Sequence, residues 1–271
     1  YDTWHAMGQG ATTGSLVVTL EALKEMHLTP EDIQLIQNDT KTCPDTGMAG
    51  ASRSLYMDGN ATIIAANKLL AAMRKEDGTL RTYDEMKAEG IETKYLGRYE
   101  TNTTPGLCRL DPNTGIGDPT PAFTYCLNLA EVEVDTKTGK TTVLKFTCVD
   151  FVGRIGNIDA VNGQAYSGIM HGIGFALKED YADVKKHANM FGAGTSYIKD
   201  VPDDINLIHI DGAISDGPFG SSGASEAFQA SGHCAVLNGI YNACGVRIHE
   251  IPALPEKVKA GLDAIAKGEK P

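Results

Sequence analysis

Three loops rich in glycine and hydroxyl side chains are the strongest candidates for chemistry in this sequence. They span residues 7–15, 47–54 and 217–226, and each precedes a segment with helical character. A glycine-rich turn at the start of a helix presents unpaired backbone N–H groups and the positive end of the helix dipole. Such a turn can hold an anion or a phosphate-bearing cofactor. The alternative that composition leaves open is that each loop is an ordinary tight turn.

The carboxylate of Glu226 ends the third of these loops. Near a helix N-terminus, a carboxylate stabilises the helix dipole by a few tenths to about 1 kcal/mol. In a pocket it could instead act as a general base toward a nucleophile held by a cofactor. The residue type and its position leave both roles open.

Several common catalytic templates are absent from the sequence. The glycines at 8, 10 and 14 are spaced one residue too widely for the dinucleotide fingerprint G-x-G-x-x-G. Residues 220–224 lack the last glycine of the nucleophile elbow G-x-S-x-G, and no Walker A motif occurs. These observations argue against a dinucleotide-binding fold, a P-loop enzyme and an α/β-hydrolase.

The six cysteines show no C-x-x-C pair, which argues against a zinc or thioredoxin-like site. We interpret them as reduced thiols and predict no direct metal ligand from the protein, and we place the chain in the cytoplasm. They are Cys43, Cys108, Cys126, Cys148, Cys234 and Cys244.

Composition excludes two classes of partner. The chain has 271 residues with 24 Lys and Arg against 35 Asp and Glu, a net charge of −11, so it offers no basic face for nucleic acid. No apolar run approaches the roughly 20 residues of a membrane span. The 30 glycines exceed the average share of roughly 7%, which indicates many close backbone approaches or positive φ angles.

Periodicity predicts a mixture of helices and strands around these loops. Helices are expected over 16–27, 58–74, 83–89, 157–177, 226–244 and 255–266. Strands are expected over 33–36, 125–134, 141–149, 205–210 and 246–248. The clearest pair is the hairpin that turns at 135–140, so we predict an α+β fold with helices layered on a largely antiparallel or mixed sheet. Residues 75–121 are expected to form a surface excursion.

An ordered set of motifs resembles the molybdenum-binding region of the xanthine dehydrogenase and aldehyde oxidoreductase family, the molybdenum hydroxylases. The resemblance runs over essentially the whole chain and looks closest to the bacterial aldehyde oxidoreductases. The motifs are MGQG at 7–10, CP at 43–44, AGASRS at 49–54, TYDEMK at 82–87, VEVD at 132–135 with TGK at 138–140, YIKDVPDD at 197–204, GPFGSSG at 217–223 and NGIYNACG at 238–245.

The resemblance implies a role for particular residues in binding a molybdopterin cofactor. Gln164 matches a family glutamine that hydrogen-bonds the pterin, and Glu226 matches the catalytic glutamate. The other implied cofactor contacts are Gly8, Gln9 and Gly10 beside the pterin or the metal's ligands, Gly50, Ala51, Ser52, Arg53 and Ser54 along the pterin and its phosphates, and Ser222, Gly223 and Ser225 at the closing loop.

The activity implied is hydroxylation of an aldehyde or an N-heterocycle, with metal-bound water as the oxygen source and Glu226 as the general base. The family cofactor supplies the metal chemistry, and bacterial members suggest its cytosine dinucleotide form. The family's catalytic subunit is longer, so residues 1–271 are expected to be its C-terminal part, inactive alone. Expected partners are the upstream half of the same subunit, [2Fe-2S] and FAD domains or subunits, a small-molecule substrate and a second copy in a homodimer.

One position departs from the family pattern. Ser225 stands where the family has a glycine close to the reacting centre, and its added side chain would narrow or polarise the site. This change leaves a second hypothesis, a non-catalytic binding or scaffold domain that keeps the fold. Gln9, Arg53, Gln164 and Glu226 together favour the enzyme.

Overall fold

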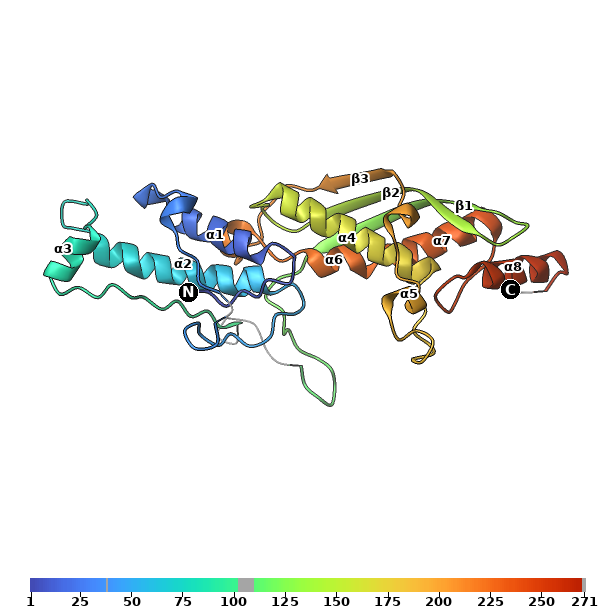
Figure 1. The fold of residues 1–271 in the computed structure, drawn as a ribbon, viewed down its shortest axis with the longest axis horizontal. Coiled ribbons are helices and arrows are strands. Elements are labelled where there is room, and N and C mark those ends of the chain that lie inside the picture. Colours follow the sequence, from blue (N-terminus) through green and yellow to red (C-terminus); the bar gives the residue numbers. More distant parts are fainter. Residues whose placement is uncertain (38, 102–109, 270–271) are drawn as a thin grey trace. The chain divides into compact units, whose positions relative to one another are not determined.

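The structure is a computed structural model that describes residues 1–37, 39–101 and 110–269. The chain divides into two units, which are described separately (Figure 1). The first unit comprises Tyr1–Thr124, Val152–Ala160 and Asp211–Gly223, and the second comprises Tyr125–Phe151, Val161–Ile210 and Ala224–Pro271.

The first unit is built on a pair of packed helices. Helix α1 (Ala11–Ala22) lies against helix α2 (Ser54–Met73), and Leu23, Ala66 and Leu70 form a buried apolar cluster there. Burial of these side chains supplies the main stabilisation of the pair. The remaining elements of this unit are η1 (Lys24–Met26), η2 (Pro30–Asp32), α3 (Tyr83–Ala88) and η5 (Pro218–Gly220).

The second unit contains a three-stranded mixed sheet in the order β1–β2–β3. Strand β1 (Tyr125–Val134) pairs antiparallel with β2 (Thr141–Phe151), and β2 pairs parallel with β3 (Asp204–His209). A parallel pair needs a crossover connection, and α4 (Ile158–Leu177) is its main element. The other elements of this unit are α5 (Met190–Ala193), η4 (Ile198–Asp200), α6 (Ser225–Ala230), α7 (Gly232–Cys244) and α8 (Pro255–Ala266).

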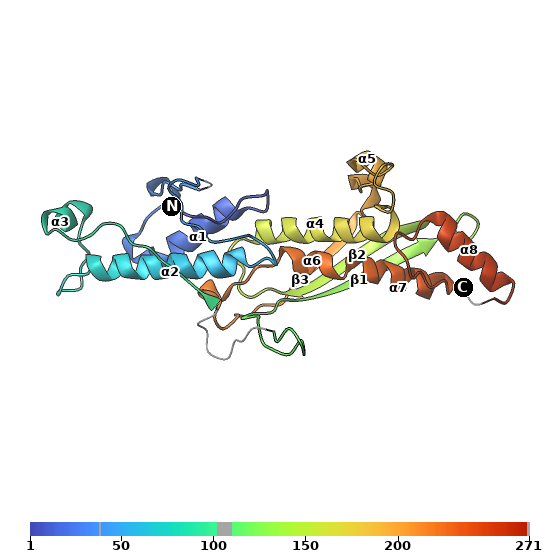
Figure 2. The same ribbon diagram turned by 90° about the horizontal axis from the view of Figure 1, so that it is seen from below.

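Helices cover one face of this sheet. The side chains of Phe146, Cys148 and Asp150 point to that inner face and are buried. Helix α7 covers this inner face, and Gly239 of α7 lies against the side chain of Val132 in β1. Figure 2 shows α6 and α7 following one another along the strands.

A buried polar network ties the sheet to α4. The Nδ1 atom of His209 lies 2.7 Å from Oδ2 of Asp150, and its Nε2 atom lies 2.8 Å from Oδ1 of Asn162. Burial raises the pKa of the Asp150 carboxyl, and the hydrogen bond from His209 opposes that rise. The ring of His209 therefore joins β3 to β2 and to the first turns of α4. It also gives the buried carboxyl of Asp150 a hydrogen-bond partner, without which its burial would lower the stability of the fold.

Helix α4 approaches α6 and α7 at backbone distance through glycines. A Cβ atom added at Gly168 would lie 2.6 Å from Cβ of Phe228, and one added at Gly172 would lie 2.8 Å from Cα of Gly232. Real Cβ atoms do not approach so closely, so only glycine allows this packing at the two positions.

The structure confirms the α+β fold with a mixed sheet and several of the predicted elements. The hairpin of β1 and β2 spans the expected residues and turns at Asp135, whose N–H donates to the carbonyl of Lys140 over 2.9 Å. Helix α3 begins after Thr82 in a capping box with Glu85. Helices α4 and α8 begin within one residue of their predicted starts and end at the predicted residues.

Two helix starts were predicted too late. The helix expected over 16–27 begins at Ala11, directly after Gly10, whose left-handed φ of 88° ends the first loop. The helix expected over 58–74 begins at Ser54. Small polar residues of both loops therefore form first helical turns, because tertiary packing outweighs their weak helix propensity.

Two predicted strands are absent and one predicted helix is broken. Residues 33–36 and 246–248 form no strand, and only Gln37 makes an isolated bridge, to Asp2. Val246 is buried against Gly261 of α8, which explains its apolar character. The helix expected over 226–244 breaks at Ser231, whose hydroxyl oxygen accepts a hydrogen bond from Nδ2 of Asn128 at 2.9 Å.

Other sequence-based expectations fall partly outside the described residues. Residues 102–109 of the excursion at 75–121, and Cys108 within them, are not described. The five described cysteines carry free thiols, and those of Cys126 and Cys148 lie 3.4 Å apart. Among the described residues, no helix combines the length and the apolar character needed to cross a bilayer.

The contact at Gly168 yields a stability prediction. We expect Gly168→Ala to lower the free energy of unfolding by about 1–3 kcal/mol, because the methyl group overpacks against Phe228. Gly163→Ala in the same helix is the control, since nothing lies within 4 Å of its added Cβ. Urea unfolding should show the control unchanged or stabilised by up to about 1 kcal/mol. Equal effects of the two changes would contradict the proposed contact.

Candidate functional site

The first unit brings the second and third glycine-rich loops together. A Cβ atom added at Gly223 would lie 1.5 Å from the carbonyl oxygen of Ser52, so a glycine is required at this contact. Beside it, Gly59 of α2 packs on Pro218 of η5. The Nδ2 atom of Asn60 donates to the carbonyl of Asp216 over 3.0 Å. Loops about 170 residues apart in the sequence are thus fixed to one another.

The second loop holds two residues in an unusual backbone conformation. Ala51 and Ser52 have φ angles of 52° and 53°, in the left-handed region that side chains other than glycine rarely adopt. Each such residue costs on the order of 1–3 kcal/mol and persists only where its surroundings impose it, often at ligand sites. Next to them, Nη2 of Arg53 donates to the carbonyl of Thr46 over 3.1 Å.

The first loop exposes its backbone. Gly8 has a φ of 96°, and a Cβ added there would meet nothing within 4 Å, so a ligand could approach this backbone closely. The side chain of Gln9 is bonded within its own loop. Its Nε2 donates to the carbonyl of His5, and its Oε1 accepts from the N–H of Met7, both over 2.6 Å.

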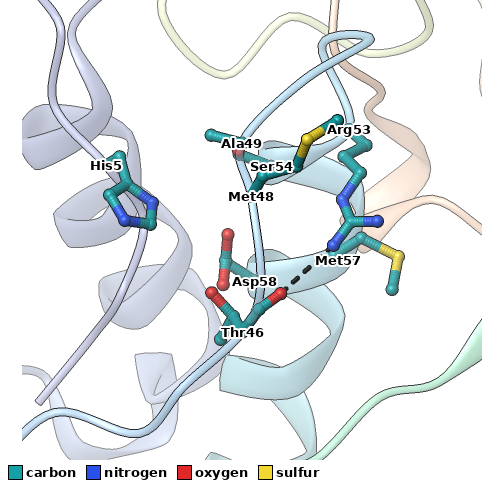
Figure 3. Close-up of a pocket in the computed structure, with 8 residues that line it drawn as sticks. All are labelled: His5, Thr46, Met48, Ala49, Arg53, Ser54, Met57 and Asp58. Atoms are coloured by element: carbon teal, nitrogen blue, oxygen red, sulfur yellow. Dashed lines mark hydrogen bonds between the residues drawn. The ribbon is translucent and has the colours of Figure 1, made fainter.

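A small pocket of the first unit lies between the start of the first loop and the second loop (Figure 3). His5 comes from the segment before the first loop, and Asp58 comes from the first turns of α2. The figure shows the Asp58 carboxylate between His5 and the segment that carries Arg53. The lining residues are His5, Thr46, Met48, Ala49, Arg53, Ser54, Met57 and Asp58.

The electrostatics of this pocket centre on Asp58, which is 9% exposed. Burial is the largest cause that raises the pKa of its carboxyl to about 6, and the neighbouring Asp2 adds to the rise. The positive charges of His5 and Arg53 oppose it. Near neutral pH the pocket therefore contains a carboxyl group that changes its charge beside a guanidinium.

Three predicted site residues belong to the second unit. Gln164 lies in α4, one turn before Gly168, and Glu226 is the second residue of α6, directly after Ser225. The contact between Gly168 and Phe228 fixes these two helix segments relative to one another. Glu226 is exposed, and Gln164 is partly buried.

The remaining predicted site residues belong to the first unit. The sequence interpretation assigned no site role to His5, Thr46, Met57 and Asp58 of the pocket. It began the helix at residue 58, so Met57 was placed outside it and Asp58 was treated as an ordinary helix residue. The available signal was Asp58, a carboxylate in the second turn of an otherwise apolar helix face, where burial is unfavourable unless the residue has a special role. The predicted residues of this unit are Gly8, Gln9, Gly10, Gly50, Ala51, Ser52, Arg53, Ser54, Ser222 and Gly223.

A search of the described residues for three or more His, Cys, Asp or Glu side chains placed to hold a metal ion finds no such group. The donors of the first unit are instead backbone N–H groups, hydroxyls and a guanidinium. These groups suit phosphates and a polar heterocycle.

The pocket yields a pH-dependent stability prediction. The pKa of folded Asp58, about 6, lies above the ordinary value of about 3.9. The folded state therefore binds this proton more tightly, and stability falls as the pH rises from about 4 to 6. We expect Asp58→Asn to remove this loss and to be more stable than the parent at pH 8 by about 2–3 kcal/mol, with little difference at pH 4.

Urea unfolding at both pH values measures this difference. Asp203→Asn, at an exposed carboxylate of the second unit, is the matched control and should show the same difference at both pH values. If Asp58→Asn changed the free energy of unfolding equally at both pH values, burial of the ionised Asp58 carboxylate would not destabilise the folded state.

A protein-family model matches this sequence. Residues 1–202 match the model described as the molybdopterin cofactor-binding domain. The match covers well over half of the chain and includes the first two glycine-rich loops and Gln164.

Curated relatives come from the same group of enzymes. The aldehyde oxidoreductase of Megalodesulfovibrio gigas is 42% identical over 264 residues, which are 97% of this chain and 29% of the relative. The probable hypoxanthine oxidase of Escherichia coli K12 is 28% identical over 277 residues, which are 96% of this chain and 29% of the relative. The chain therefore spans about 29% of the length of these relatives.

Solved structures agree with the sequence matches. The aldehyde oxidoreductase of Desulfovibrio desulfuricans superposes with a TM-score of 0.91 at 46% identity, over 96% of this chain and 28% of that protein. The enzyme from Desulfovibrio gigas superposes with a TM-score of 0.93 at 42% identity, over 97% and 29%. With the family model and the loop geometry, these matches show that the chain belongs to the molybdopterin cofactor-binding domain family of the molybdenum hydroxylases.

Proposed function

We propose that the chain is the C-terminal part of a catalytic subunit that hydroxylates an aldehyde or an N-heterocycle with a molybdenum cofactor. The observation that carries this proposal is the 42% identity to an aldehyde oxidoreductase over nearly the whole chain. The motif resemblance adds support, because it implies cofactor contacts for Gln9, Arg53 and Gln164 and a catalytic role for Glu226. The substrate class follows the names of the relatives, which include both aldehyde and purine enzymes.

The residues of the first unit fit a phosphate-bearing pterin. The backbone at Gly8 is open, so a flat ligand could lie directly against it. The strained turn at Ala51 and Ser52 precedes α2, and Arg53 beside it offers a guanidinium that can bind phosphate through two bonds. Gly8, Gln9, Gly10 and the strip from Gly50 to Ser54 would therefore hold the cofactor, with Ser222 and Gly223 closing this side.

The residues of the second unit would handle the proton. When bound, the cofactor supplies the activated water that is the source of the new oxygen atom, together with a two-electron acceptor. Glu226 would act as the general base that takes up a proton. Gln164 would hold the pterin through its amide, and the packing of Gly168 on Phe228 holds both helix segments in place.

Further features of the whole enzyme follow the family and are part of this proposal. They are the cytosine dinucleotide form of the cofactor, [2Fe-2S] clusters and FAD in other domains or subunits, a homodimer and a cytoplasmic location. The chain alone is expected to be inactive, because it spans about 29% of its relatives.

Replacement of Glu226 tests the proposed base. In the full-length enzyme, we expect Glu226→Gln to lower the turnover of the preferred substrate by about 10²–10⁴-fold, because a positioned base contributes about that much. Molybdenum content, measured by elemental analysis, should not change. Glu256→Gln is the matched control, since Glu256 is also an exposed glutamate at the second position of a helix.

Near-normal turnover of Glu226→Gln would show that another group is the base. A fully matured full-length protein without molybdenum would contradict the enzyme proposal and favour a binding or scaffold domain.

Replacement of Ser225 tests the departure from the family pattern. We expect Ser225→Gly to raise kcat/KM for bulky aldehydes relative to acetaldehyde by about tenfold, because removing the side chain widens the space beside Glu226. The ratio of kcat/KM for a bulky and a small aldehyde measures the effect and cancels differences in cofactor loading. An unchanged ratio would place Ser225 away from the substrate.

A further inference from the structure

The face of the sheet opposite α7 is exposed and strongly apolar at one end. We call this face the outer face. In β1, Tyr125, Leu127 and Leu129 are 64%, 54% and 58% exposed. At the other edge of the sheet, Ile208 in β3 and Ile210 just after it are 44% and 52% exposed. These are large apolar side chains on a surface that water contacts.

The register joins these side chains into continuous rows across the sheet. Leu127 pairs with Val149, which pairs with Ile208. One row along, Tyr125 pairs with Phe151, and their rings are 6.4 Å apart. The apolar side chains therefore lie side by side and form one patch.

Polarity changes along the strands. The row of Leu129 and Thr147 ends on Asn206, and the next row is Glu131, Lys145 and Asp204. In that row, Nζ of Lys145 lies 3.4 Å from Oδ2 of Asp204. The outer face thus has an apolar end and an end where charged side chains surround one exposed leucine, Leu144 at the register shift. Such a change is expected where one end is covered and the other meets water.

We propose that the apolar end of the outer face packs against the part of the catalytic subunit that the relatives carry outside the matched segment. This inference rests on the proposal that the chain is part of a longer subunit. About 70% of each relative lies outside the match, so ample chain is available to cover it. Rows of valine, isoleucine, leucine and aromatic residues are typical of a permanently buried layer rather than of a transient docking surface.

Site-specific thiol labelling of the full-length enzyme tests this packing. We expect a maleimide to modify Leu127→Cys and Ile208→Cys at least tenfold more slowly in the native enzyme than after denaturation. Glu133→Cys, on the charged end of the same strand, is the control and should react within about threefold of its denatured rate. Peptide mass spectrometry assigns the label and separates these sites from the native cysteines.

A second measurement needs no variant. Hydroxyl-radical oxidation of Tyr125 in the unmodified enzyme should be at least fivefold slower in the native than in the denatured state. Native-state reactivity of Tyr125, Leu127→Cys and Ile208→Cys near the denatured rates would overturn the proposal.

Two further outcomes would also overturn it. Protection that disappears when the enzyme is diluted to monomers would mean that a second copy covers the face. Equal protection of Glu133→Cys would contradict the boundary at the charged row. Because labelling requires neither cofactor nor turnover, its result is independent of whether Glu226 is the base.

Discussion

The second unit depends on the approach of α4 to α6 and α7 at backbone distance. Gly168 and Gly172 face Phe228 and Gly232 with no space for a methyl group. A contact of this kind sets the spacing of two helices more rigidly than long side chains can, because neither backbone can yield. Gln164 precedes this contact by one turn and Glu226 precedes Phe228 by two residues, so the positions of both depend on it. The contact of Gly168 with Phe228 therefore determines both the packing of these helices and the positions of the residues proposed for the chemistry.

The first unit uses glycine in a second way. Gly223 lets its loop touch Ser52 backbone to backbone, whereas Gly8 leaves its own loop open to an approaching ligand. The glycine excess therefore has two causes. Glycines of one kind admit protein backbone, and Gly8 leaves its backbone open to solvent. The sequence already placed Gly168 and Gly172 in a helix, but it could not name the backbone that each of them admits.

Sequence predicted best what neighbouring residues determine. The hairpin turn at Asp135 and the capping box at Thr82 are local, and both are present. The sequence-based prediction was wrong where contacts with residues far away in the sequence determine the secondary structure. The segments 33–36 and 246–248 find no neighbouring strand. The predicted helix is interrupted at Ser231, whose hydroxyl accepts a hydrogen bond from Asn128 of the distant β1. For the site, the motif resemblance supplied the candidate residues. The contact of Ser52 with Gly223 and the burial of Asp58 could be recognised only in the structure.

The pocket beside the second loop places a buried carboxyl group next to a guanidinium. A chain with a net charge of −11 can bind an anion only where local groups outweigh the overall field. In this pocket the guanidinium of Arg53 would supply that local attraction, and ionised Asp58 would oppose it. An anion bound beside Arg53 disfavours the carboxylate form of Asp58 by repulsion. By linkage, protonation of Asp58 would favour such an anion equally, so acidification that protonates Asp58 would strengthen binding beside Arg53.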